Sequence, residues 1–180
     1  AQLIDINSNK VTESSIGLPG LLSDWDKKRT ESYLRQFNSL PEYLQTFLAS
    51  TSAQISWNNN DKKIIYTATA SATMPDQFKQ PLPGSNSQPQ DRILKPNQTY
   101  TYDIEEDRNF SIGDISKNWQ WYPTGNHVYR LDDNNIVIKE YDNSNVTIRF
   151  AGTVFENFAI PYPSGKQFLV LTNLNGTTTP

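Results

Sequence analysis

The chain has 180 residues and a formal net charge of −3, with no cysteine and one histidine, His127. These counts exclude disulfides, thiolate catalysis, cysteine-ligated metals and any site that needs two imidazoles. The acidic balance argues against a nucleic-acid partner, and no apolar run reaches the ~20 residues of a transmembrane segment. Aromatic residues make up 12% of the chain, so a core is expected although only 36% of residues are hydrophobic.

The N-terminal part predicts one short strand followed by helix. Residues 3–6 form an apolar patch suited to an edge strand. Ser23 and the acidic residues after it are typical of a helix start, and Ser39 with Pro41 marks a second start. An apolar stripe then recurs at helical spacing over 40–48. We therefore expect an amphipathic helix or a helix pair over 21–50, packed on a sheet.

After residue 50 the hydrophobic period changes from 3.6 to 2, which indicates strands. Asx-rich clusters at 58–61, 132–135 and 142–145 separate apolar runs and predict tight turns. The runs predicted as strands lie at 55–57, 64–70, 100–104, 110–112, 128–131, 136–141, 146–151, 153–160 and 167–174. The expected fold class is α+β, with the helices on a mainly antiparallel sheet or half-barrel of seven to nine strands.

We expect one domain over 1–180, with the β region at 51–174. Residues 74–98 hold five of the eleven prolines and form either a lid or a slack tether. Residues 175–180 resemble a linker. The Ala-Gln start fits cleavage after a signal peptide, and the polar composition fits a bacterial, extracytoplasmic protein that is secreted, periplasmic or at the cell surface.

The most suggestive motif is Trp119-x-Trp121-Tyr122, with His127 close behind it. Exposed indoles and phenols can stack on sugar rings or dock on a protein surface, so these four residues are the predicted ligand-binding set. On this hypothesis Trp119→Ala or Trp121→Ala weakens ligand binding without unfolding the chain. The competing interpretation places the indoles in the core, where large aromatics usually lie. His127 could also serve a hydrolytic triad, but the chain has no GxSxG motif.

Carboxylates provide a second interpretation. A glycosidase needs two carboxyl groups about 5–9.5 Å apart, and Glu105, Glu106, Asp107, Glu140 and Glu156 are candidates. A cleft joining Glu140 or Glu156 to an indole would favour this activity.

The sequence thus favours a binding module for a glycan, a protein or a surface, with no catalytic residue, metal or cofactor. The first alternative is a carboxylate-dependent polysaccharide hydrolase. The second is a structural subunit of a surface or pilus-like assembly, which an open apolar face on the 40–48 helix would favour.

Overall fold

The computed structural model describes residues 2–5, 10–13, 17–75, 83–132, 135–152, 154, 158–174 and 177–179. The chain divides into two compact units, Ala1–Pro41 and Glu42–Pro180, and each is considered by itself. The single-domain organisation stays a prediction. Glu156, one of the candidate carboxylates, lies outside the described residues.

The first unit holds a hairpin and a long helix. Strand β1 (Gln2–Asp5) pairs antiparallel with β2 (Lys10–Glu13), and helix α1 spans Leu18–Asn38. The helix begins five residues before the predicted start at Ser23, because Gly17 takes the N-cap position and Pro19 lies in the first turn, where its missing N–H is harmless. It ends where the Ser39 amide bonds back to the Arg35 carbonyl at 3.1 Å.

The second unit opens with helix α2 (Glu42–Thr51), so the helix-pair prediction is confirmed. Leu44 and Leu48 of the predicted apolar stripe are buried. Tyr43, on the same helix, hydrogen-bonds to Tyr102, which places α2 against the sheet that contains Tyr102.

That sheet has four antiparallel strands in the order β3-β4-β7-β8. Its strands are β3 (Ser52–Trp57), β4 (Lys63–Ala68), β7 (Gln98–Asp103) and β8 (Arg108–Asp114). Every residue of β4 is buried, because the strand is central and both of its faces are covered.

The proline-rich segment 74–98 is partly structured where it is described. It contains β6 (Ile93–Leu94), which pairs with β5 (Ala72–Thr73). Arg92 anchors the segment to the turn between β7 and β8, through a 3.1 Å ion pair with the buried carboxylate of Asp107. Residues 76–82 lie outside the described residues.

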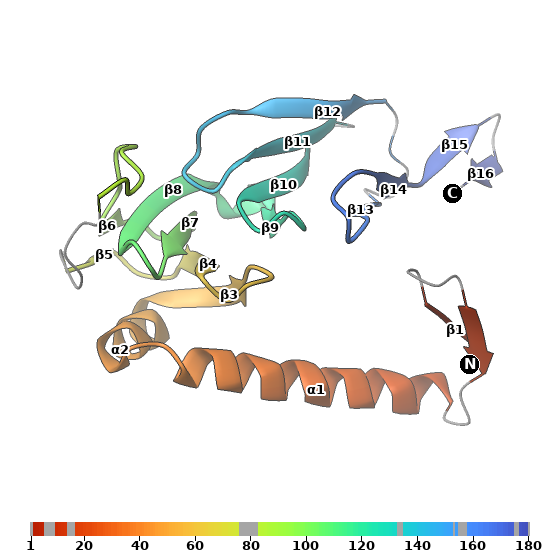
Figure 1. The fold of residues 1–180 in the computed structure, drawn as a ribbon, viewed down its shortest axis with the longest axis horizontal. Helices are drawn as coiled ribbons and strands as arrows, with labels where there is room; N and C mark the ends of the chain where they lie inside the picture. Colours follow the sequence, from red (N-terminus) through yellow and green to blue (C-terminus); the bar gives the residue numbers. More distant parts are fainter. Residues whose placement is uncertain are drawn as a thin grey trace. The chain divides into compact units, whose positions relative to one another are not determined.

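A second four-stranded antiparallel sheet follows, in the order β12-β11-β10-β9 (Figure 1). The short 3-10 helix η1 (Ile115–Lys117) leads into it. Its strands are β9 (Gln120–Trp121), β10 (His127–Asp132), β11 (Asn135–Glu140) and β12 (Thr147–Ala151). The Asx turn predicted at 142–145 is confirmed, with positive φ at Asn143 and Asn145.

Two hairpins complete the chain. One joins β13 (Ala159–Pro161) to β14 (Phe168–Val170), and the other joins β15 (Thr172–Leu174) to β16 (Thr177–Thr179). The last strand falls within the predicted tail, of which residues 175, 176 and 180 lie outside the described residues.

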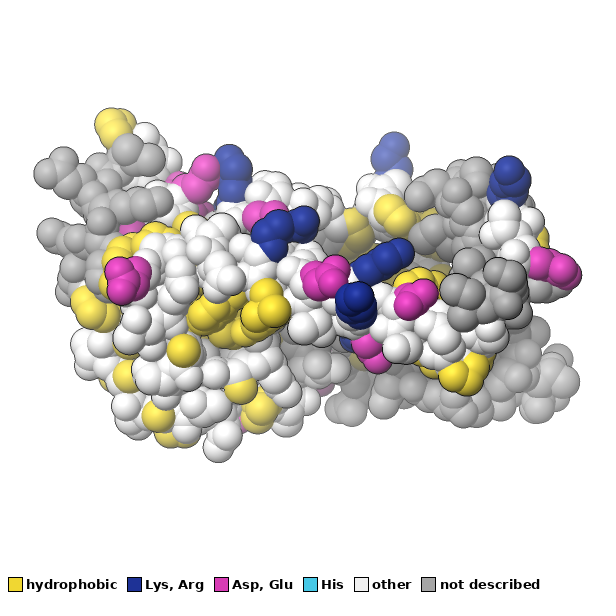
Figure 2. All heavy atoms as spheres, turned by 90° about the horizontal axis from the view of Figure 1, so that it is seen from below, with side chains coloured by type: hydrophobic (Ala, Val, Ile, Leu, Met, Phe, Trp, Pro, Cys, Tyr) yellow, Lys and Arg dark blue, Asp and Glu magenta, His cyan; other side chains and the backbone are white. Residues whose placement is uncertain are grey.

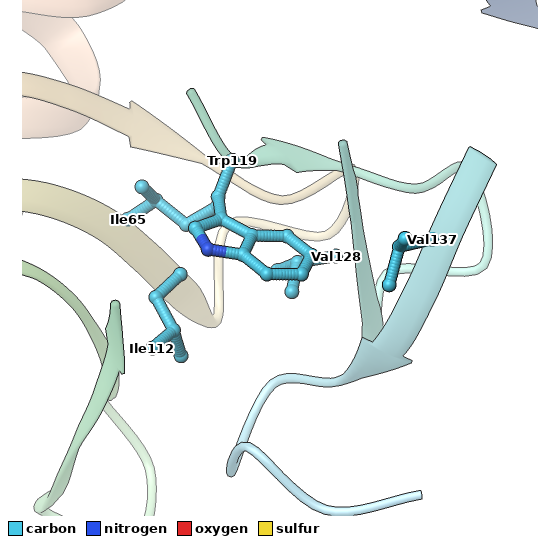
Figure 3. Close-up of a cluster of buried hydrophobic side chains, with 5 residues drawn as sticks. All are labelled: Ile65, Ile112, Trp119, Val128 and Val137. Carbon is cyan, nitrogen blue, oxygen red and sulfur yellow. The ribbon is translucent and has the colours of Figure 1, made fainter. Parts of the chain in front are cut away.

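The α+β class is therefore correct, but the expectation of one sheet or half-barrel of seven to nine strands is wrong. The described strands form several small sheets, and none of these closes. The reason lies in the residues between β8 and β10. There the chain turns through η1, and the Trp119 side chain enters a buried cluster between the two four-stranded sheets. The first sheet contributes Ile65 and Ile112 to this cluster, and the second contributes Val128 and Val137 (Figure 3).

The opposite face of the second sheet is also covered. Tyr129, Ile136 and Ile138 form a second buried cluster, which includes Ala159 of β13 and is flanked by Phe168 of β14. Since successive residues of a strand point to opposite faces, β10 and β11 contribute side chains to both clusters. The second sheet is thus a middle layer between the first sheet and the β13–β14 hairpin.

Candidate functional site

Trp119, the first predicted ligand-binding residue, lies in the core. Its side chain is 9% exposed. Gly113 of β8 makes room for it, since a Cβ at Gly113 would lie 3.3 Å from the indole Nε1. That Nε1 has no hydrogen-bond partner among the described residues, so the indole is held by packing and by two cations over its ring.

Trp121 belongs to the same cluster but is only partly buried. It packs against the cluster around Trp119, and its Nε1 donates to the Ser56 carbonyl at 3.1 Å. This bond ties β9 to β3. Both tryptophans thus join the two four-stranded sheets, Trp119 from a buried position and Trp121 from a partly buried one.

Tyr122 and His127 lie on the other side of the second sheet. The Tyr122 ring stacks on Phe168 with centroids 5.6 Å apart, and its hydroxyl donates to the Gly165 carbonyl. His127 lies at an angle to the Tyr122 ring, and its Nδ1 is 2.9 Å from the Thr124 hydroxyl. The structure therefore separates the four predicted residues into two pairs.

Tyr122 and His127 line a hollow of about 670 Å³, which we call the aromatic hollow. It lies between the second sheet and the β13–β14 hairpin. Its lining residues are Tyr122, Thr124, His127, Ile136, Ile138, Arg149, Phe150, Gly165, Lys166, Gln167, Phe168 and Val170. Aromatic and aliphatic side chains make up half of this lining, and Thr124, His127, Arg149, Lys166 and Gln167 add polar groups beside them. Ligand sites commonly combine apolar walls with polar groups that fix orientation.

A register shift in the second sheet brings Arg149 into this lining. Ile136 pairs with Phe150 while Val137 pairs with Ile148, so Arg149 is an extra residue on β12. A bulge of this kind re-aims side chains and is over-represented next to functional sites. Here it allows the adjacent residues Arg149 and Phe150 both to line the hollow.

The aromatic hollow is positively charged where it is described. Arg149 and Lys166 line it and are exposed, and none of the described lining residues is acidic. The chain as a whole carries a charge of −3, so this local excess of cations is opposite in sign to the rest of the molecule. The arrangement suits an anionic group placed beside an apolar body.

Carboxylates gather in a different hollow of about 570 Å³, which we call the acidic hollow. Its acidic lining residues are Asp103, Glu105, Glu106, Glu140 and Asp142. Glu105 and Glu106, two of the three sequence-predicted acids around the β7–β8 turn, thus line the same hollow as Glu140. However, no indole is among the described residues that line this hollow.

The carboxylates of the acidic hollow are engaged by neighbouring groups. Asp103 pairs with the buried Lys63 at 3.0 Å. Glu106 accepts the Asn86 amide N–H at 2.8 Å, and Glu140 accepts from Asn145 at 2.6 Å. These contacts fix the turns that carry the acids, which is a structural role.

Hydrogen bonds from neighbouring groups also determine the pKa of Asp142. Burial favours its neutral form, but hydrogen bonds from Ser144 and Asn86 outweigh burial and hold the pKa of Asp142 below its usual range. A carboxyl group held ionised in this way is a poor general acid at neutral pH.

The chain matches no protein-family model, no curated protein and no solved structure. Its function must therefore be inferred from its own geometry.

Three further observations bear on the class of site. Among the described residues, no group of three or more acidic or histidine side chains is placed to hold a metal ion. No helix in the described part of the chain has both the length and the apolar character needed to cross a bilayer. On the face drawn in Figure 2, Lys and Arg are interspersed with Asp and Glu and form no continuous basic surface. The expectation of no nucleic-acid partner stays a prediction.

The sequence did not single out Arg149, Phe150, Lys166 or Phe168. The first two were assigned to a predicted strand at 146–151, and Phe168 to another at 167–174. Strand alternation alone would put Arg149 and Phe150 on opposite faces. Only the bulge, which depends on pairing with β11, makes both available to one site.

Proposed function

We propose that this protein is a binding module and that the aromatic hollow is its ligand site. The ligand class is an anionic molecule or segment with an apolar body. The observation that carries the proposal is a hollow of about 670 Å³ with aromatic and aliphatic walls, in which the charged lining residues are Arg149 and Lys166.

Two physical terms support binding there. Burying apolar ligand surface contributes roughly 25 cal/mol per Å² before the cost of association is subtracted. A guanidinium or ammonium paired with a ligand anion adds a charge-assisted hydrogen bond, which also selects against cationic ligands. The volume falls within the ~300–1,000 Å³ of typical ligand pockets.

This proposal keeps part of the sequence-based hypothesis. Tyr122 and His127 line the hollow, whereas Trp119 and Trp121 act through the core that supports it. Recognition of a glycan, protein or surface remains open to test. The extracytoplasmic, bacterial origin stays a prediction from composition.

The test uses 8-anilinonaphthalene-1-sulfonate, a probe with an aromatic body and one sulfonate. In ¹H–¹⁵N spectra of the full chain, we expect probe-induced shifts to cluster at residues 136–138, 149–150 and 165–168. Arg149→Glu with Lys166→Glu should weaken probe binding by about tenfold, since both cations then repel the sulfonate. The matched control is Lys95→Glu, an exposed lysine outside the hollow.

Shifts that cluster elsewhere, or equal loss of affinity in the Lys95→Glu control, would contradict the proposal. Lys95→Glu reverses one charge, so it is compared with Arg149→Glu and Lys166→Glu made singly, each of which changes the net charge by the same amount.

The hydrolase is a second candidate because the acidic hollow brings Glu106 and Glu140 together. It predicts release of reducing sugar from a polysaccharide panel, abolished in Glu140→Gln. We favour the binding module, since the carboxylates accept hydrogen bonds from their own loops. The assembly alternative lacks the support of an open stripe on α2, where Leu44 and Leu48 are buried.

A further inference from the structure

We propose that the ligand is an extended acidic segment of a partner protein, which adds as a strand to the open edge of β12 and inserts an apolar side chain into the aromatic hollow. This inference rests on the proposed function and names the partner of the same site. It combines three observations: a strand edge, a neighbouring hollow and a local positive charge.

The edge comes first. Strand β12 is the outermost strand of its sheet, and within the described part of the chain its outer edge pairs with no other strand. It is also accessible, since four of its five residues are exposed, and Ile148 is 61% exposed. An edge of this kind offers unpaired N–H and C=O groups to an incoming strand.

The hollow lies on one face of the same strand. Because of the bulge, Arg149 and Phe150 of β12 line it together with Phe168 and Lys166 of the β13–β14 hairpin and its turn. A peptide strand beside β12 presents alternate side chains to this face. Backbone pairing then supplies affinity, and the hollow selects an apolar side chain.

Charge identifies the partner as acidic and argues against a second copy of this chain. Arg149 is the central residue of the five-residue strand Thr147–Ala151. A symmetric antiparallel pair of two β12 strands in full register would place one Arg149 opposite the other, and like charges directly opposite are destabilising. An incoming acidic segment instead meets Arg149 and Lys166 with favourable charge.

The test uses the ¹⁵N-labelled full chain and a blocked nine-residue peptide in which Asp alternates with Phe and Val. We expect binding with new amide protection in residues 147–151 and shifts around the hollow. The same peptide N-methylated at alternate backbone nitrogens keeps its side chains but cannot pair fully, and should bind about tenfold more weakly.

A charge-swap arm checks the partner chemistry. Arg149→Glu with Lys166→Glu should lose the Asp peptide and gain the matching Lys peptide, while Lys95→Glu should behave as the unmodified chain. Equal binding of the Asp and Lys peptides to the unmodified chain would overturn the acidic assignment.

The outcomes separate this inference from the proposed function. If the naphthalene sulfonate binds at the hollow but neither peptide binds, or the N-methylated peptide binds equally well, strand addition is wrong and the binding site stands. Binding of polygalacturonate at the hollow without peptide binding would assign an acidic glycan instead. If neither probe nor peptide binds there, both proposals fail.

Discussion

The ammonium nitrogen of Lys139 lies 4.0 Å from the centre of the Trp119 indole ring, inside the layer between the two four-stranded sheets. Lys139 is only 4% exposed and donates a hydrogen bond to the Ile112 carbonyl at 2.6 Å. Arg130 approaches the same ring, with its guanidinium carbon 5.0 Å from the ring centre. The negative face of an aromatic ring attracts a cation, and this attraction partly replaces the hydration that the cation loses on burial.

The buried ammonium makes stability depend on pH. Burial, followed by repulsion from Arg130, lowers the pKa of Lys139 from 10.5 to about 8. Between these values the unfolded chain holds the proton and the native chain does not, so raising the pH stabilises the native state by up to roughly 1.4 kcal/mol per pH unit. Urea unfolding from pH 7 to 9.5 should show this rise, and Lys139→Met should flatten it. If the free energy of unfolding of Lys139→Met rises with pH as in the unmodified chain, Lys139 is not the group responsible. The exposed Lys95→Met is the control and should keep the rise.

Buried tyrosines act in the opposite direction at higher pH. Burial raises the pKa of Tyr141 to about 12, and burial also raises the pKa of Tyr66 and Tyr102. Their stabilising contribution is complete below pH 10 and is lost as pH rises towards 12, because only the unfolded chain then releases these protons. Absorbance at 295 nm should show fewer than the chain's nine tyrosines ionising before a cooperative unfolding step. Gradual ionisation of all nine would contradict it.

The two tryptophans should differ in their effect on stability. Trp119→Ala removes a buried ring and leaves two cations without their aromatic face, so we expect a loss of about 3–5 kcal/mol. Trp121→Ala removes a partly buried ring and one bond to Ser56, with an expected loss of about 1–2 kcal/mol. Guanidinium denaturation measures both. Equal losses of unfolding free energy would show that Trp119 does not join the sheets as described. Because Trp121 does not line the aromatic hollow, the folded Trp121→Ala variant should still bind the probe.

Gly125 and Gly84 provide a matched pair for separating backbone strain from steric conflict. Both have positive φ, at 78° and 82°, but a Cβ at Gly125 would lie 2.4 Å from the Asn59 side-chain oxygen, whereas no described atom lies within 4 Å of one at Gly84. Gly84→Ala should cost about 1–2 kcal/mol from φ alone. Gly125→Ala should cost clearly more, because it also disturbs the Asn58 bond to the Gly125 carbonyl. Equal shifts in melting temperature would contradict this.

Local features of the fold were predictable from local signals. The stripe containing Leu44 and Leu48 predicted α2, and the Asx clusters predicted turns such as the one at Asn143 and Asn145. Each depends on residues within one or two turns of chain, where propensity and periodicity act directly. The start of α1 was predicted at Ser23 and not at Leu18, because the prediction relied on Ser23 and the acids after it and gave no weight to Pro19, although proline is favourable in a first helical turn.

Division into separate sheets was not predictable, because it depends on long-range packing. Nothing near Trp119 in the sequence shows that its ring meets Ile65, a residue 54 positions earlier. Only part of the candidate site was predicted from the sequence, because its other residues also depend on long-range pairing. Tyr122 and His127 were identified from a local motif, whereas Arg149 enters the hollow through a pairing shift with β11 that alternation cannot reveal.

The place of Trp119 also determines how the protein can be monitored. An indole in contact with both sheets loses its surroundings when either sheet separates, so the share of Trp119 in the emission of the four tryptophans reports whether the two sheets stay packed together. The sheets should accordingly melt as one cooperative unit, with their slowest-exchanging amides opening together. A fluorescence change on adding a ligand therefore needs a companion measurement of secondary structure before it is interpreted as occupancy.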